Sequence, residues 1–114
     1  MRKLVLSEIS SKGYRNRFEI VKDILSVLDF AGIRGSKKTH IMYGANLSYK
    51  LLERYIREVL ESGLVYSERG IFFISDKGKE FLKIYVNYEN ERKEIDKHFM
   101  NINNGKNELE KMLE

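Results

Sequence analysis

This chain of 114 residues contains no cysteine, proline or tryptophan. Without cysteine the chain can form neither a disulfide framework nor a thiolate metal site, which fits a reducing compartment. No stretch reaches the roughly 18 apolar residues of a membrane span, and the early apolar run, Leu4 to Leu6, is too short for a signal peptide. We therefore expect a soluble cytoplasmic protein with no membrane partner.

Positive charge is concentrated in the first half of the chain. Lys and Arg number 21 against 17 Asp and Glu, a formal net charge of +4. Residues 1 to 57 hold 12 of the basic residues and 5 acidic ones, whereas residues 79 to 114 hold 7 basic and 8 acidic residues. Such an excess favours a polyanion partner, although a lysine-rich composition also produces basic helical surfaces without one.

Helical periodicity begins after residues 1 to 14, which we expect to form an arm or a short strand. Asn16 and Glu19 have the spacing of a capping box, and apolar residues then recur three and four apart. They predict a first helix from about Arg17 to Phe30, which Gly32 ends.

Two further helices and a hairpin follow closely. Thr39 is expected to cap a helix of about two turns that ends at Asn46, and Ser48 to cap a helix that continues to Ser62. Residues 64 to 66 and 71 to 74 are short β-prone runs separated by four polar or glycine residues, which suits a hairpin. This order predicts a winged helix-turn-helix head over residues 15 to 78, mainly α with a small β-hairpin wing and therefore of the α+β class.

The polar face of the helix that follows Ser48 carries the residues best suited to reading DNA. Lys50, Arg54 and Arg57 are spaced i, i+4 and i+7, so they lie along one side. In a helix-turn-helix the N-terminal half of this helix enters the major groove, which makes these residues the candidate contacts: Ser48, Tyr49, Lys50, Glu53, Arg54 and Arg57. The alternative is an ordinary solvated face with an ion pair between Glu53 and Arg57.

Contacts with the DNA backbone are expected on either side of this helix. Lys37, Lys38 and Thr39 stand at the start of the second helix, where free amides and the helix dipole attract phosphate. Arg69 stands at the tip of the hairpin, where it could lie against a phosphate or enter the minor groove, with Glu68 beside it.

Two runs of sequence resemble a known family. KTHIMYGANLSYKLL, from Lys38 to Leu52, and SDKGKEFL, from Ser75 to Leu82, are similar to archaeal winged-helix DNA-binding proteins, above all the ten-kilodalton chromatin-associated and regulator-like type of Sulfolobus. The resemblance covers about residues 18 to 88. It implies a winged-helix domain with double-stranded DNA as ligand and a C-terminal helix that pairs with its copy in an antiparallel coiled coil.

Residues 79 to 114 are expected to form one long dimerisation helix. Positions four and three apart along it make a coiled-coil seam: Phe81, Tyr85, Tyr88, Arg92, Ile95, Phe99, Ile102, Lys106, Leu109 and Leu113. The alternative is a helix that packs on its own head. Asn103, Asn104 and Gly105 are poor helix formers, so the sequence leaves open whether this helix breaks near Asn103.

No pattern points to catalysis, a metal or a cofactor. His40 and His98 are isolated, and the chain has neither a glycine-rich phosphate loop nor a nucleophile elbow. Four tyrosines fall on apolar stripes and are expected in the core or the seam, which leaves no exposed aromatic platform for single-stranded nucleic acid: Tyr43, Tyr55, Tyr85 and Tyr88.

The sequence therefore predicts a non-enzymatic homodimer that binds double-stranded DNA without cofactor or small-molecule ligand. Its role would be that of a transcriptional regulator or of a nucleoid-associated, chromatin-type architectural protein. The alternative is a winged-helix protein-protein interaction module in a larger complex.

Overall fold

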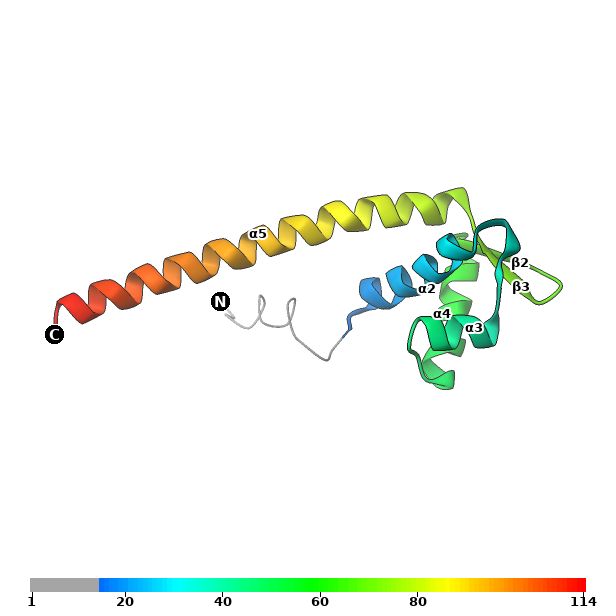
Figure 1. Ribbon diagram of the computed structural model, residues 1–114, viewed down its shortest axis with the longest axis horizontal. Helices are drawn as coiled ribbons and strands as arrows, with labels where there is room; N and C mark the ends of the chain where they lie inside the picture. Colours follow the sequence, from blue (N-terminus) through cyan, green and yellow to red (C-terminus); the bar gives the residue numbers. More distant parts are fainter. Residues whose placement is uncertain (1–14) are drawn as a thin grey trace. The chain divides into compact units, whose positions relative to one another are not determined.

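The computed structural model describes residues 15 to 114, and the expected arm at residues 1 to 14 lies outside them (Figure 1). The elements in chain order are α2 (Arg17–Ala31), the 3-10 helix η1 (Gly32–Arg34), β1 (Ser36–Lys37), α3 (Lys38–Gly44), α4 (Tyr49–Glu61), β2 (Val65–Glu68), β3 (Ile71–Ile74) and α5 (Asp76–Met112). The described residues fall into two units, residues 15 to 85, which we call the head, and residues 86 to 114. The predicted fold class, a winged helix-turn-helix with a long C-terminal helix, is confirmed.

Helix α2 begins with the predicted capping box. Asn16 Oδ1 accepts a hydrogen bond from Glu19 N–H, and the Glu19 carboxylate accepts one from Asn16 N–H, each at 2.9 Å. The helix ends at Gly32, whose φ of 61° lies in the region that favours glycine. Because its apolar residues recur at helical spacing, one side of α2 is buried: Ile20, Val21, Ile24, Leu25 and Leu28.

The helix-turn-helix differs from the sequence prediction at its first helix. Helix α3 is seven residues long and ends at Gly44 rather than Asn46. Its N-cap position is occupied by Lys37 without a side-chain hydrogen bond, so the prediction that Thr39 caps it was wrong. The reason is that β1 leads directly into α3, which puts Thr39 inside the first helical turn. Asn46, with a φ of 55°, makes the turn to α4.

The sheet has three antiparallel strands in the order β1-β3-β2. The hairpin prediction is confirmed: β2 pairs with β3 from Val65 opposite Ile74 to Glu68 opposite Ile71. The turn is shorter than expected, because both of its residues, Arg69 and Gly70, have positive φ and close a two-residue loop. The third strand, β1, was not predicted, since two residues are too few to show an alternating pattern.

The core lies in the head, between the helices and the sheet. Its fully buried side chains come from α2, α3 and α4: Ile24, Leu25, Leu28, Ile41, Leu52 and Val59. The strands add Val65, Phe72 and Ile74. The core therefore fixes the positions of α3 and α4 relative to the wing.

Helix α5 also starts at a side-chain cap. Ser75 Oγ accepts a hydrogen bond from Gly78 N–H at 3.1 Å and donates one to the Gly63 carbonyl oxygen at 2.6 Å. The helix then continues through Asn103 to Met112, so it does not break near Asn103, a point that the sequence left open. A poor helix former lowers the stability of a helix only slightly, and the hydrogen bonds of the helical turns on both sides of it outweigh this cost. Among residues 15 to 114, no helix combines the length and apolarity of a membrane span.

Candidate nucleic-acid interface

The outward face of α4 carries its basic residues in one row. Lys50, Arg54 and Arg57 are all exposed, while α4 buries its opposite face in the core. Their spacing of four and three residues places the three positive charges on the same side of the helix. The guanidinium of Arg54 lies over the ring of Tyr55, 5.3 Å from its centroid. The row is therefore accessible from solvent.

The first residues of α4 have distinct roles. Ser48 Oγ accepts a hydrogen bond from Leu51 N–H at 3.2 Å, so this hydroxyl is the N-cap of the helix, as the sequence predicts. Tyr49 follows as the first helical residue, with 66% of its surface exposed. The remaining amides of this first turn favour a negatively charged ligand.

Two of the candidate residues, one on α3 and one on α4, pair with each other. Lys38 Nζ lies 2.9 Å from Glu53 Oε2, and both side chains are partly exposed. The hydrogen bond from Lys38 is the main cause that lowers the pKa of Glu53, and the same hydrogen bond raises the pKa of Lys38. Arg57, the partner in the solvated-face alternative, makes only a smaller electrostatic contribution. Lys38 on α3 therefore offsets the negative charge of the Glu53 carboxylate.

The other two candidates for backbone contact flank Lys38. Lys37 ends β1 and occupies the N-cap position of α3, and its side chain is exposed. Thr39 lies within α3 and is exposed as well. Both side chains can therefore meet a ligand at the start of α3.

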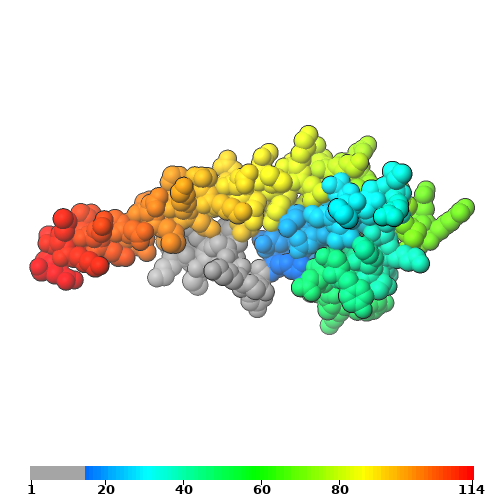
Figure 2. All heavy atoms as spheres, viewed as in Figure 1, coloured from blue at the N-terminus to red at the C-terminus, as the bar shows by residue number. Residues whose placement is uncertain are grey.

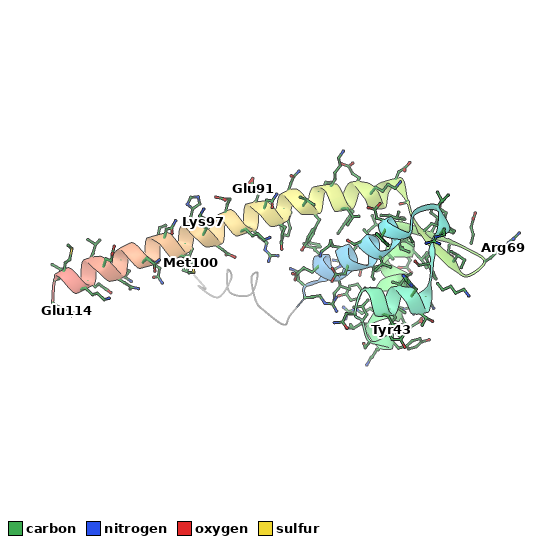
Figure 3. The ribbon with its side chains drawn as sticks, in the orientation of Figure 1. Tyr43, Arg69, Glu91, Lys97, Met100 and Glu114 are labelled. Atoms are coloured by element: carbon green, nitrogen blue, oxygen red, sulfur yellow. The ribbon has the colours of Figure 1, made fainter. Side chains whose placement is uncertain are left out.

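Arg69 stands at the tip of the wing, which projects from the surface of the head (Figure 2). Its side chain is exposed and points away from the sheet (Figure 3). Glu68, the last residue of β2, is exposed beside it. The wing thus presents one positive and one negative charge at its end.

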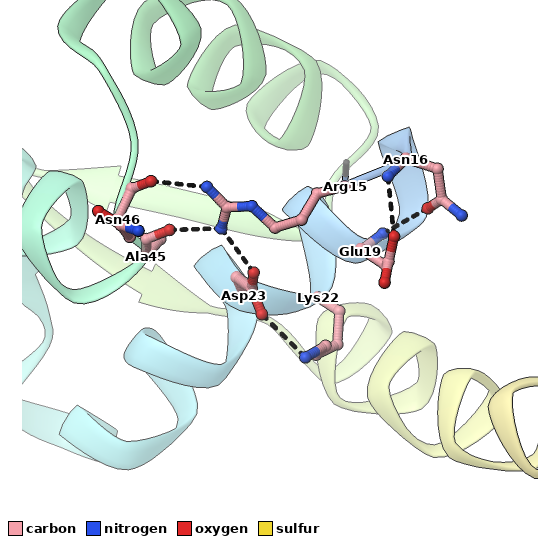
Figure 4. A network of polar contacts seen from close by, with 7 residues as sticks. All are labelled: Arg15, Asn16, Glu19, Lys22, Asp23, Ala45 and Asn46. Atoms are coloured by element: carbon pink, nitrogen blue, oxygen red, sulfur yellow. Dashed lines mark hydrogen bonds and ion pairs between the residues drawn. The ribbon is translucent and has the colours of Figure 1, made fainter. Parts of the chain in front are cut away.

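Arg15 was missed by sequence reasoning, although it positions the turn that leads into α4 (Figure 4). Its guanidinium donates hydrogen bonds to Asp23 Oδ2 at 2.7 Å, to the Ala45 carbonyl oxygen at 2.6 Å and to the Asn46 carbonyl oxygen at 2.6 Å. It therefore joins the beginning of α2 to the turn between α3 and α4. These partners are up to 31 positions away in sequence, so no local pattern could have revealed them.

The predicted seam divides between the two units. Phe81 packs against the core of the head, and Tyr85 is buried there, with Lys22 Nζ 5.7 Å from its ring centroid. Beyond the head, apolar seam residues keep large exposed surfaces, among them Ile95, Phe99, Ile102, Leu109 and Leu113. In the same part, Arg92 lies over the ring of Tyr88, and Lys106 is exposed.

Neither histidine lies in a group of side chains that could hold a metal ion in the described part of the chain. Among residues 15 to 114, no three His, Asp or Glu side chains gather closely enough to hold an ion. His98 lies beside Glu94, at 3.8 Å, and His40 is exposed on α3.

Comparisons with known proteins place this geometry in a family. Residues 14 to 93 match a family model described as winged helix-turn-helix. An uncharacterized protein of Methanocaldococcus jannaschii is 29% identical over 77 residues, which are 66% of this chain and 75% of that protein. The crystal structure of Sso10a-2, a DNA-binding protein from Sulfolobus solfataricus, is 23% identical, covers 88% of this chain and 98% of its own, and superposes with a TM-score of 0.49. Since the family model spans more than half of the sequence and confirms the resemblance to winged-helix proteins, the chain belongs to the winged helix-turn-helix family.

Proposed function

We propose that this protein binds double-stranded DNA by inserting α4 into the major groove. The observation that carries the proposal is the exposed row of Lys50, Arg54 and Arg57 on α4, the second helix of the helix-turn-helix. Phosphates attract such a row, and Arg and Lys can also donate hydrogen bonds to guanine O6 and N7.

Different positions on α4 serve different contacts. Tyr49, Lys50 and Glu53 are near its N-terminal half and would meet base edges, whereas Arg54 and Arg57 are long enough to reach bases or flanking phosphates. A lone carboxylate would be repelled by DNA. Because Lys38 lies 2.9 Å from Glu53, the pair approaches the groove without net charge, and Glu53 can accept a hydrogen bond from cytosine N4.

The start of α3 and the wing would hold the DNA backbone. Lys37 and Thr39 are exposed beside Lys38, and Arg69 is exposed at the wing tip. Contacts of this kind set the orientation of the protein on the duplex without reading sequence.

We further propose that residues 86 to 112 of α5 pair with a second copy in an antiparallel coiled coil. The support is the row of apolar seam residues that one chain leaves exposed, including Ile95, Phe99 and Ile102. At 1.5 Å per residue this part of α5 is about 40 Å long, so antiparallel pairing would put the heads at opposite ends. Their spacing would exceed the roughly 34 Å of one DNA turn.

A dimer of this kind would bend the duplex, use widely spaced half-sites or bridge two duplexes. These activities suit a transcriptional regulator or a chromatin-type architectural protein of the nucleoid. Selection of bound fragments from genomic DNA separates the two roles, because a regulator yields discrete sites and an architectural protein yields broad coverage.

Titration of labelled duplex DNA with the full chain tests the proposal. We expect the affinity to fall with salt with a logarithmic slope of about −5 to −7 per dimer, as for six to eight neutralised phosphates. Replacing Lys50, Arg54 and Arg57 together with alanine should weaken binding at least about tenfold.

A charge-matched control removes three exposed lysines of α5, Lys83, Lys93 and Lys97, and should retain the wild-type affinity. If the wild type does not bind duplex DNA at low salt, the proposal is wrong, and a protein-interaction role in a larger complex becomes the better account.

A further inference from the structure

A groove opens on the head between the end of α2, the strand β1 and α3. Its volume is about 660 Å³, and we call it the α2–α3 groove. It is lined by aromatic, basic and small side chains: Phe30, Ala31, Arg34, Gly35, Ser36, Lys37, Thr39, His40, Tyr43 and Ile71. Only Lys37 and Thr39 of these belong to the proposed duplex contacts.

Two aromatic rings of this groove are free of the core. Phe30 is 95% exposed in the last turn of α2, and Tyr43 is 75% exposed on α3 (Figure 3). The prediction that Tyr43 belongs to the core or the seam was therefore wrong. Helix α3 has only seven residues and buries only Ile41 in full, so Tyr43 falls on its outer side. Most of the surface of both residues is therefore accessible to a ligand.

The charge of the groove is positive. Arg34 and Lys37 line it together with His40, and none of the lining side chains that the structure describes is acidic. A smaller hollow next to it shares Phe30 and His40, and its one carboxylate, Asp23, is already paired with Lys22 and Arg15. The groove therefore presents an electrostatic surface complementary to an anion.

The α2–α3 groove and the outward face of α4 lie on different sides of α3. Tyr43 and His40 are three residues apart and share one side of the helix. Lys38 is two residues before His40, hence about 200° away around the helix, and it contacts Glu53 on α4. A ligand in the groove therefore leaves the outward face of α4 uncovered.

We propose that the α2–α3 groove is a second nucleic-acid site, which binds single-stranded DNA with bases stacked on Phe30 and Tyr43 and phosphates held by Arg34 and Lys37. Exposed rings beside a basic groove are the arrangement that single-strand binding requires, because every base has a face that can stack. A duplex keeps its bases stacked inside the helix and cannot use these rings. An acidic peptide could pair with Arg34 and Lys37, but it lacks the succession of flat bases that can stack on the two rings.

The choice of DNA over RNA rests on the proposed function. If α4 holds a duplex, unpaired nucleotides of that duplex are the nearest single strand to the other side of α3. The rest of the inference depends only on the groove.

The test measures the fluorescence anisotropy of a labelled oligothymidylate of about 12 nucleotides on addition of the full chain. The decisive variant is Phe30→Leu with Tyr43→Leu, which keeps apolar bulk but removes both rings. We expect it to bind at least about tenfold more weakly, given the usual energy of base stacking on an aromatic ring. Because both side chains are so exposed, the variant should unfold at the wild-type temperature, which circular dichroism checks.

The matched control replaces Lys50, Arg54 and Arg57 with alanine and should keep most of the oligothymidylate affinity. The inference is overturned if the leucine variant binds as well as the wild type, if the control loses binding instead, or if an oligouridylate of equal length binds more tightly. Failure of wild-type duplex binding would overturn only the proposed function, because the oligothymidylate titration is a separate measurement.

Discussion

Replacing Arg15 with alanine should destabilise the head more than the replacement of a surface residue usually does. The guanidinium donates to Asp23 and to the carbonyl oxygens of Ala45 and Asn46, at distances between 2.6 and 2.7 Å. Those carbonyls belong to the turn that sets α4 against α3. The substitution therefore removes three hydrogen bonds and leaves two backbone acceptors at the turn without their donor.

The size of the effect follows from the exposure of the groups. A hydrogen bond that involves a charged group contributes about 1.5 to 3 kcal/mol, but the contributions of one side chain do not add. The side chains of Arg15 and Asp23 are 31% and 24% exposed, so solvent offsets part of the ion pair. We expect a net loss of about 2 kcal/mol, or about 8 to 16 °C in Tm for a unit the size of the head.

Urea and thermal unfolding, followed by near-ultraviolet circular dichroism of the buried Tyr55 and Tyr85, measure this loss. The matched control is Arg17→Ala. Arg17 Nε donates to Glu58 at 2.6 Å, but its side chain is 67% exposed, so Tm should hardly change. If Arg15→Ala unfolds at the same urea concentration as the wild type, the three hydrogen bonds do not position the turn and the reasoning fails.

Four further substitutions have defined outcomes. Gly78→Ala should cost about 1 to 3 kcal/mol in urea unfolding, because the added Cβ would collide with the Leu64 carbonyl oxygen. Gly105→Ala, which meets nothing within 4 Å, should instead gain about 0.5 to 1 kcal/mol. Lys38→Met should raise the pKa of Glu53 toward its ordinary value in an NMR titration. The stabilisation from this pair is present above the unfolded-state pKa of Glu53 and is lost as pH falls through the lower folded-state pKa. The stability of the wild type should therefore fall over this acid range, whereas the variant, which has no such pair, should not show this fall. Phe99→Glu should shift the sedimentation of the full chain from dimer to monomer, and a variant that still sediments as a dimer would contradict the coiled-coil proposal.

Features that depend on neighbouring residues could be predicted from the sequence. The capping box of Asn16 and Glu19 and the N-cap at Ser48 are both present, because a cap involves side chains and amides within three positions. The apolar stripe of α4 is buried for the same reason, since its period alone decides which side faces the core. The order of these local features was sufficient for the fold class.

Features that depend on distant residues could not be predicted. The partner of Glu53 is Lys38 on α3, 15 positions away, rather than Arg57 on the same helix. A sequence shows which residues share a helix face, but the distance between α3 and α4 depends on packing of the core. The same holds for β1, which is a strand only because β3 lies beside it. Tyr43 was misplaced because a helix of seven residues is too short for its period to identify the buried side.

Helix α3 connects these observations, because its two sides carry different chemistry. The side with Lys38 holds Glu53 of α4, and the side with His40 and Tyr43 lines a basic, aromatic groove. A seven-residue helix has little stability of its own, so both sides depend on the contacts that fix it. Arg15 holds its C-terminal end, and therefore Arg15→Ala should weaken duplex binding through α4 and oligothymidylate binding in the groove together. Variants of the basic row of α4 alone, or of the two groove rings alone, should weaken only one of them.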